Sequence, residues 1–163
     1  MSRELFQVLV IPHRIDANGQ RRYLLFKRSD LDVWQWIAGG GENKETPEQT
    51  ARREALEEAG IPEDTHLIRL DSMASIPRIH FADHQLWETD VYVIPEYSFG
   101  LEVKDEKVRL SGEHSESAWL DYETACSRLE WDSNKTALWE LQSRLSATHA
   151  EEIVGRERGG RVL

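Results

Sequence analysis

The sequence predicts a single domain of mixed α and β structure (α/β or α+β) with a mixed β-sheet, on three observations. The chain has 163 residues, 39% of them apolar, which suffices for one compact domain and is too short for two. Apolar runs of strand length recur between Phe6 and Ile94. Two segments with helical spacing and capping residues lie at positions 46–60 and 121–153.

A β-hairpin is expected to open the domain. The runs Phe6–Ile11 (FQVLVI) and Tyr23–Phe26 (YLLF) have the length and composition of strands, and Asn18-Gly19 between them favours a tight turn. Two later runs, Leu67–Ile76 and Trp87–Ile94, are also predicted as strands, the second because of its aromatic and β-branched residues.

The first helix has clear signals at both ends. Thr46 is a good N-cap, Pro47 suits the first helical position and Gln49 stands at the capping-box position. Gly60 follows as a stop signal. The sequence therefore predicts a helix between Thr46 and Gly60.

Two helices are expected at the end of the chain, from Asp121 to about Ile153, with a break near Trp131–Asn134 where Asp, Ser and Asn offer caps. Apolar residues at helical spacing in the second should face the core, namely Ala137, Leu138, Leu141 and Leu145. Residues 155–163 (GRERGGRVL) have little to bury. We expect one domain over residues 1–154 and a flexible C-terminal tail over residues 155–163.

Charge and composition exclude several classes of protein. A net charge of −10 argues against a nucleic-acid partner, because that binding depends on Lys and Arg neutralising phosphates. No segment approaches the roughly 18 to 20 apolar residues of a membrane span, and the start lacks a cleavage site. The single cysteine, Cys126, cannot form an internal disulfide, which fits a reducing compartment. We expect a cytoplasmic protein without a membrane partner.

The first helix carries three carboxylates on one face, Glu54, Glu57 and Glu58, at spacings i, i+3 and i+4. Like charges so placed repel, and oxygen ligands at that spacing suit Mg²⁺. The opposite stripe is small and apolar, for packing on a sheet: Ala51, Ala55 and Ala59. Gly39-Gly40-Gly41, just upstream, is expected to form a loop that lets backbone approach a ligand or metal. Many acidic helix faces are merely solvated, so the spacing of the whole segment decides.

That segment follows a fixed register: Gly39, Glu45 after five residues, Arg53-Glu54 after seven more, then Glu57-Glu58, Gly60 and Ile61. The register resembles the Nudix box at each specified position. Two neighbouring positions depart from the usual pattern: Lys44 stands where the family has glycine, and Ile37-Ala38 where it has a proline before the glycines. Neither departure removes a ligand.

The resemblance implies the Nudix fold, a mixed sheet in an α/β/α sandwich, and a role for each residue of the box. Glu54, Glu57 and Glu58 would hold Mg²⁺ or Mn²⁺, and the backbone carbonyl of Ala38 would join them. Arg53 would pair with Glu45 and stiffen the loop against the helix. Arg53 projects about 100° away from Glu54, so it can do this without displacing a cation.

Segments between residues 6 and 145 also resemble dihydroneopterin triphosphate pyrophosphatases and related nucleoside triphosphate pyrophosphohydrolases: Arg28-Ser29-Asp30, Asp32–Gln35, Glu113-His114, Ala118–Asp121 and Trp131 with Ser133-Asn134. This resemblance implies that Glu113, or else Glu116, supplies a further metal ligand or activates water. Lys27 and Arg28, with Gly39 and Gly40, are candidate phosphate contacts, and Trp34 is a candidate to stack on a ring or to pack.

The implied reaction is hydrolysis of a nucleoside or pterin triphosphate with release of pyrophosphate, by in-line attack of a metal-bound water. Glu57, Glu54 and Glu113 remain candidates for the base. ADP-ribose, dinucleoside polyphosphates and nucleotide sugars remain alternative substrates. A non-catalytic nucleotide-binding module is an alternative of another class, whose signature would be loss of the box carboxylates. The resemblance also leaves a homodimer open.

Overall fold

The computed structural model describes residues 2–159, and the side chains of residues 2–148. Its elements follow in the order β1 (Arg3–Ile15), β2 (Arg21–Arg28), β3 (Trp34–Gln35), β4 (Ile37–Glu42), α1 (Pro47–Ala59), β5 (His66–Pro77), η1 (Arg78–His80), η2 (His84–Leu86), β6 (Val93–Glu102), β7 (His114–Leu120), α2 (Tyr122–Arg128) and α3 (Asp132–Gly159). None of the helices in this described part is long and apolar enough to span a membrane.

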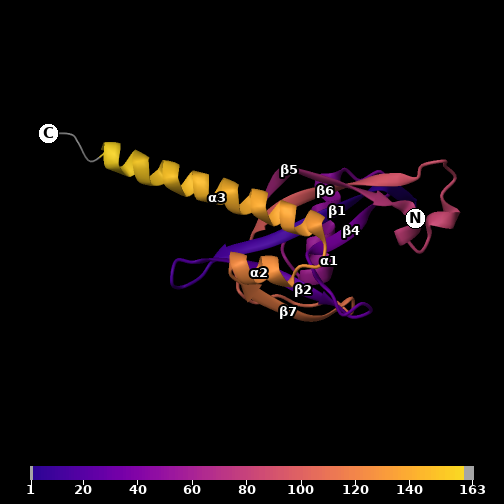
Figure 1. Cartoon of the computed structure of the whole chain (residues 1–163), viewed down its shortest axis with the longest axis horizontal. Coiled ribbons are helices and arrows are strands. Elements are labelled where there is room, and N and C mark those ends of the chain that lie inside the picture. The colour runs from indigo at the N-terminus through magenta and orange to yellow at the C-terminus, as the bar shows by residue number, and fades with distance from the viewer. Residues whose placement is uncertain (1, 160–163) are drawn as a thin grey trace.

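Within the described residues, seven strands form one mixed sheet whose main path is β3-β2-β1-β6-β5, with β4 paired to β1 and β7 to β2. β1 and β6 run parallel, whereas β1 pairs antiparallel with β2 and β4. Helix α1 lies on one face of the sheet, and α2 and α3 lie on the other (Figure 1). The predicted mixed sheet in an α/β/α sandwich is confirmed.

The first helix forms as its local signals predict. The Thr46 side chain accepts from the backbone N–H of Gln49, the Gln49 side chain accepts from the N–H of Thr46, and Pro47 is the first helical residue. Gly60 ends the helix with φ 67°, a left-handed conformation that glycine adopts without a Cβ clash. The alanine stripe Ala51, Ala55 and Ala59 is buried against the sheet.

Alternation along β1 divides the core into two layers. Val8 and Val10 pack on the α1 side, while Leu9 and Ile11 pack on the side of α2 and α3, with the predicted residues Ala137, Leu138, Leu141 and the half-buried Leu145. The buried Trp36 anchors the start of α3, because its backbone N–H donates to Asn134 Oδ1 and its Nε1 donates to the Asn134 carbonyl.

Three sequence predictions need correction. The strand expected to begin at Trp87 begins only at Val93. Residues 78–92 instead form a protruding arm with two short helical turns (Figure 1). Arg78 holds this arm together, because its Nη1 donates to the Thr89 and Val91 carbonyls. The glycine triplet is not a loop but part of β4, because Gly39 and Gly40 pair with β1.

The third correction concerns the C-terminal end. The break between α2 and α3 is confirmed, but α3 continues to Gly159, beyond the expected end near Ile153. The division into a domain over residues 1–154 and a flexible tail over residues 155–163 stays a prediction. Residues 160–163 of that tail lie outside the described residues.

Candidate active site

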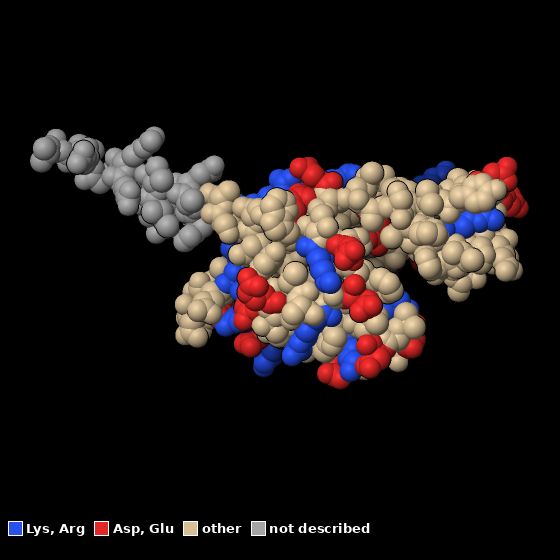
Figure 2. All heavy atoms as spheres, in the orientation of Figure 1, with Lys and Arg blue, Asp and Glu red and all other residues tan. Residues whose placement is uncertain are grey.

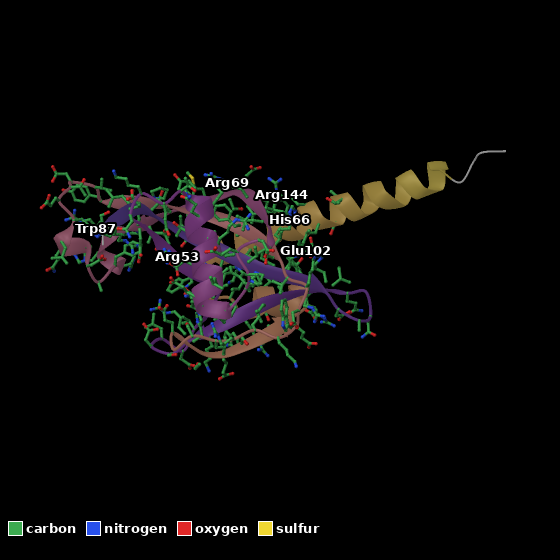
Figure 3. All side chains as sticks on the ribbon, turned by 180° about the vertical axis from the view of Figure 1, so that it is seen from behind. Arg53, His66, Arg69, Trp87, Glu102 and Arg144 are labelled. Atoms are coloured by element: carbon green, nitrogen blue, oxygen red, sulfur yellow. The ribbon has the colours of Figure 1, made fainter. Side chains whose placement is uncertain are left out.

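Arg53 connects the glycine strand to the acidic face of α1 (Figure 3). Its Nε donates to Glu45 Oε1 at 2.8 Å, and its Nη2 donates to Glu45 Oε2 at 3.1 Å and to the Gly40 carbonyl at 2.9 Å. Its Nη1 donates to Glu54 at 2.9 Å and to Glu57 at 3.2 Å. The ion pair that the resemblance implied between Arg53 and Glu45 is therefore present, and the same guanidinium also holds two of the carboxylates.

The backbone of the loop between β4 and α1 explains why glycine is usual at position 44, where this chain has lysine. Asn43 and Lys44 both have positive φ, 49° and 66°, a region in which glycine is the least strained residue. The Lys44 N–H donates to Glu4 Oε1 at 2.8 Å, which helps to hold this conformation. The residue itself is exposed, in agreement with a solvated lysine.

Gly39 and Glu54 approach each other closely. A Cβ on Gly39 would lie 2.0 Å from Cδ of Glu54, so only glycine fits beside this carboxylate. Burial raises the pKa of Glu54 to about 8 against the opposing effect of Arg53, and the charges of Glu58 and Glu57 raise it further. Glu54 is thus a carboxylate whose negative charge lacks full compensation.

Gly39→Ala is expected to move Glu54 out of position. The added methyl group overlaps the carboxylate, which must rotate away or shift the strand at a cost of about 1–3 kcal/mol. We expect a lower midpoint of thermal unfolding and a fall in metal-dependent turnover. Gly112→Ala is the control for unfolding alone, because an added Cβ there meets nothing within 4 Å but Gly112 lines the cleft. Wild-type turnover in the Gly39 variant would contradict the proposed position of Glu54.

Glu58 and His114 form a buried pair across 56 positions of sequence. His114 Nε2 lies 2.6 Å from Glu58 Oε2, and the two side chains are 2% and 4% exposed. Burial raises the pKa of Glu58, against the opposing hydrogen bond from His114. Phe26 packs on the His114 ring at 4.9 Å. Sequence reasoning assigned no role to His114; its position beside Glu113 was the only signal.

An open cleft of about 1070 Å³ lies beside these carboxylates. Ala38, Glu58, Glu113 and His114 line one end. The walls are the loop of residues 28–31 and residues 76–83 at the base of the arm, and Figure 2 shows the surface hollowed between the arm and the part that carries β7.

The other predicted site residues differ in position. Arg28 lines the cleft, but Lys27 and Glu116 do not, because Lys27 is held by Asp32 at 2.8 Å and by Glu116 at 3.3 Å. Trp34 also lies outside the lining; it packs against the core of α2 and α3, with the Arg128 guanidinium over its ring. The structure therefore brings Ala38, Arg28, Glu58 and Glu113 to the cleft and leaves Lys27, Trp34 and the alternative Glu116 outside it. Four other predicted metal ligands and phosphate contacts, on β4 and α1, do not line the cleft either, namely Gly39, Gly40, Glu54 and Glu57.

Glu96, which sequence reasoning did not single out, lies in the cleft floor. It is 7% exposed, and burial raises its pKa to about 7. A carboxyl with a raised pKa binds its proton more tightly in the folded state. Glu96 therefore lowers stability as the pH rises from its ordinary pKa of about 4.5 through 7.

Glu96→Gln is expected to remove this loss. In metal-free buffer the variant should exceed the wild type in free energy of unfolding by about 2–3 kcal/mol at pH 8 and by little at pH 4.5. Urea unfolding across this range checks the prediction. If plots of the free energy of unfolding against pH were parallel for the two proteins, the prediction would be wrong. Glu63→Gln, at an exposed position, is the control.

The donor set fits a divalent cation. In residues 2–148 no three Asp, Glu, His or Cys side chains converge into a ready-made site. Arg53 donates to Glu54 and Glu57, and His114 is hydrogen-bonded to Glu58. Yet the buried Glu58 and the half-buried Glu54 are acids with raised pKa values on one helix face. A cation would relieve both the burial cost and the mutual repulsion.

The chain belongs to the Nudix family, because the model of the NUDIX domain matches residues 8–139. The structure of a NUDIX hydrolase from Listeria monocytogenes is 44% identical, with a TM-score of 0.80, and the match covers 89% of this chain and 97% of that one. The chain is accordingly a Nudix pyrophosphohydrolase, a hydrolase acting on acid anhydrides, in a family that typically uses divalent metals.

Three further relatives have names that specify a substrate, and these names are of two kinds. The dihydroneopterin triphosphate diphosphatase of Haemophilus influenzae is 29% identical over 133 residues, covering 80% of this chain and 83% of that protein. The asymmetrical bis(5'-nucleosyl)-tetraphosphatase of Rattus norvegicus is 29% identical over 147 residues, covering 90% and 94%. The structure of the E. coli dihydroneopterin triphosphate pyrophosphohydrolase is 26% identical with a TM-score of 0.68, covering 85% and 94%.

Proposed function

We propose that this protein hydrolyses a nucleoside or pterin triphosphate with Mg²⁺ or Mn²⁺ and releases pyrophosphate. The observation that carries the proposal is the acidic face of α1, where the buried Glu58 lines a cleft large enough for such a substrate and Glu54, with a side chain 12% exposed, lies one helical turn away. Retention of Glu54, Glu57 and Glu58 argues against a purely binding module.

The cation would be held by Glu54, Glu57 and Glu58, with the Ala38 carbonyl at the same end of the cleft. When bound, a divalent cation neutralises phosphate oxygens and makes a water molecule more acidic. Arg53 would orient Glu54 and Glu57, since its Nη1 donates to both, while Glu45 and the Gly40 carbonyl fix the rest of its guanidinium. Glu58 would be held in place by His114.

Water attacks a phosphorus in line, the P–O anhydride bond breaks, and the proton of the water passes to a carboxylate. Among the three candidates for this base we favour Glu113. It is exposed, lines the cleft and lies next to His114, outside the three carboxylates on α1. A carboxylate that donates to a cation is a weaker base, which disfavours Glu54 and Glu57.

Glu113→Gln is expected to lower kcat by about 10²-fold at neutral pH. Glu116→Gln is the matched control, since Glu116 pairs with Lys27 away from the cleft. A kcat equal to that of the wild type in the Glu113 variant would reassign the base to α1.

The relatives support two substrate classes. The proteins from H. influenzae and E. coli are named for dihydroneopterin triphosphate, and the rat protein is named for a bis(5'-nucleosyl) tetraphosphate. Both substrates join an aromatic ring system to a chain of at least three phosphates. A dinucleoside tetraphosphate is therefore the second candidate, favoured by the larger coverage of the rat relative. ADP-ribose and nucleotide sugars, with two phosphates, rank lower.

Product analysis decides between these candidates. Purified protein and Mg²⁺ would be incubated with dihydroneopterin triphosphate, the common nucleoside triphosphates, diadenosine tetraphosphate, ADP-ribose and a nucleotide sugar, in water labelled with ¹⁸O. We expect pyrophosphate from a triphosphate and label in one of the two products. Turnover of the tetraphosphate alone would favour the second candidate, and release of only inorganic phosphate would overturn both the proposed bond and its products.

Two further expectations stay predictions. A cytoplasmic location rests on composition alone, and a homodimer rests on the family resemblance. On the face drawn in Figure 2, acidic and basic residues intermix rather than forming a basic stripe, in line with a small-molecule substrate.

A further inference from the structure

The cleft is acidic, although its proposed substrate is an anion. Five carboxylates line it: Asp30, Glu58, Asp83, Glu96 and Glu113. Its two guanidinium groups belong to Arg3 and Arg28. Arg28 is already neutralised, because its Nε donates to Asp30 at 2.8 Å and its Nη2 pairs with the same carboxylate at 2.5 Å. Arg3 forms no ion pair with any carboxylate in the part of the chain that the structure describes.

The Arg3 guanidinium is held by uncharged groups. Its carbon lies 4.8 Å from the ring centre of Phe81 and 5.6 Å from that of Trp87, and its Nη2 donates to Gln7 Oε1 at 3.1 Å. Its Nε is buried and has no hydrogen-bond partner among the described residues. Figure 3 places Trp87 in the arm, so Arg3 joins β1 to the arm. A guanidinium has five N–H donors; one donates to Gln7 and the one on Nε is buried, so the donors left for a ligand are those on the two terminal nitrogens.

Gly40 brings this cation close to the reacting end of the cleft. A Cβ on Gly40 would lie 2.3 Å from Arg3 Nη1, so the guanidinium rests directly on the glycine backbone. Ala38, which lines the cleft and whose carbonyl is a proposed metal ligand, is two residues away on the same strand. At the rise of a β-strand, two residues span about 7 Å. With a cation held at the Ala38 carbonyl, the Arg3 guanidinium would therefore meet a phosphate further along the same chain.

We propose that Arg3 is a phosphate-binding residue that selects substrates with three or more phosphates. The inference rests on the proposed function and deepens it. The cation on α1 would serve the phosphates at the bond that breaks, and the Arg3 guanidinium would donate to a phosphate further along the chain. Planar, preorganised N–H donors suit phosphate oxygens. A ligand with two phosphates is too short to reach both positions.

The test compares inorganic tripolyphosphate with pyrophosphate as ligands, so it does not depend on knowing the substrate. Isothermal titration calorimetry with Mg²⁺ present would be run on the wild type, Arg3→Met and Arg3→Lys. Arg22→Met is the matched control, because Arg22 pairs with Asp16 at the hairpin, away from the cleft. We expect Arg3→Met to weaken tripolyphosphate by about 10-fold to 100-fold, the range of a charged hydrogen bond, and pyrophosphate by less than about threefold. Arg3→Lys should recover part of the loss.

A second variant guards against a merely structural effect at the arm. Gly40→Ala leaves Arg3 in the sequence but pushes its guanidinium aside, and it should produce the same selective loss. Equal losses for the two ligands, or unchanged tripolyphosphate binding in Arg3→Met, would overturn the proposal. If the wild type binds tripolyphosphate through Arg3 but hydrolyses no substrate, the proposed function fails and the Arg3 site stands. If Arg3→Met turns over substrates with the triphosphate preference of the wild type, the proposed function stands and the Arg3 proposal fails.

Discussion

Glu57→Gln is expected to lower metal-dependent turnover by about 10³-fold, or about 4 kcal/mol of activation free energy. The amide removes one negative ligand from the proposed metal site and keeps the size of the side chain. Because 58% of the Glu57 side chain is exposed, the free energy of unfolding should change by no more than about 0.5 kcal/mol. Steady-state kinetics and urea unfolding of the same preparation measure both quantities.

The combination of lost activity and kept stability is the diagnostic feature of this variant. Glu63→Gln, just beyond the end of α1, changes the net charge equally at an exposed position and should leave both quantities unchanged. If Glu57→Gln retained turnover within about threefold of the wild type, a change of under 1 kcal/mol, Glu57 would hold no essential cation.

Arg53→Ala should have the largest effect on stability. The substitution removes hydrogen bonds to Glu45, Glu54 and Glu57 and to the Gly40 carbonyl. The side chains of Glu45 and Glu54 are 21% and 12% exposed, so both carboxylates would be left without their main partner in a poorly solvated place. We expect a loss of about 3 kcal/mol in the free energy of unfolding, measured by urea unfolding, and a fall of at least about 10²-fold in turnover, since two of the proposed metal ligands would lose their orientation.

Arg52→Ala is the matched control on the same helix. Arg52 also donates to backbone carbonyls, those of Glu63 and Thr65, but it lies away from the acidic face and the cleft. Its loss should cost about 1 kcal/mol and leave kcat unchanged. If both variants lost the same stability and the same activity, Arg53 would be an ordinary helix residue rather than the connection between β4 and the carboxylates.

Local signals in the sequence predicted the parts of the fold that depend on neighbouring residues. The capping box at Thr46, the stop at Gly60 and the helical spacing of Leu138 and Leu141 each act within a few residues, so they survive in any tertiary context. The spacing of the box carboxylates is equally local, which is why they could be placed on one face of α1 before the structure was known.

Features that depend on distant pairing could not be predicted in the same way. The glycines of β4 resemble a loop in sequence and become a strand only because β1 supplies hydrogen-bond partners. Residues 87–92 have strand-like composition but form part of the arm. The approach of His114 to Glu58 and of Arg3 to Gly40 joins segments 56 and 37 positions apart. Lys27 resembled a free cation until the structure brought Asp32 and Glu116 to it.

The most direct test of the central claim is turnover of the wild-type protein after removal of metal with EDTA, followed by stepwise return of Mg²⁺ or Mn²⁺. The substrates are dihydroneopterin triphosphate, nucleoside triphosphates and diadenosine tetraphosphate. We predict no turnover without metal and saturable recovery with it, with pyrophosphate as the product from a triphosphate. Turnover that is indifferent to metal, or binding of metal with no hydrolysis of any phosphoanhydride in the set, would contradict the claim that the carboxylates of α1 form a metal-dependent hydrolytic site.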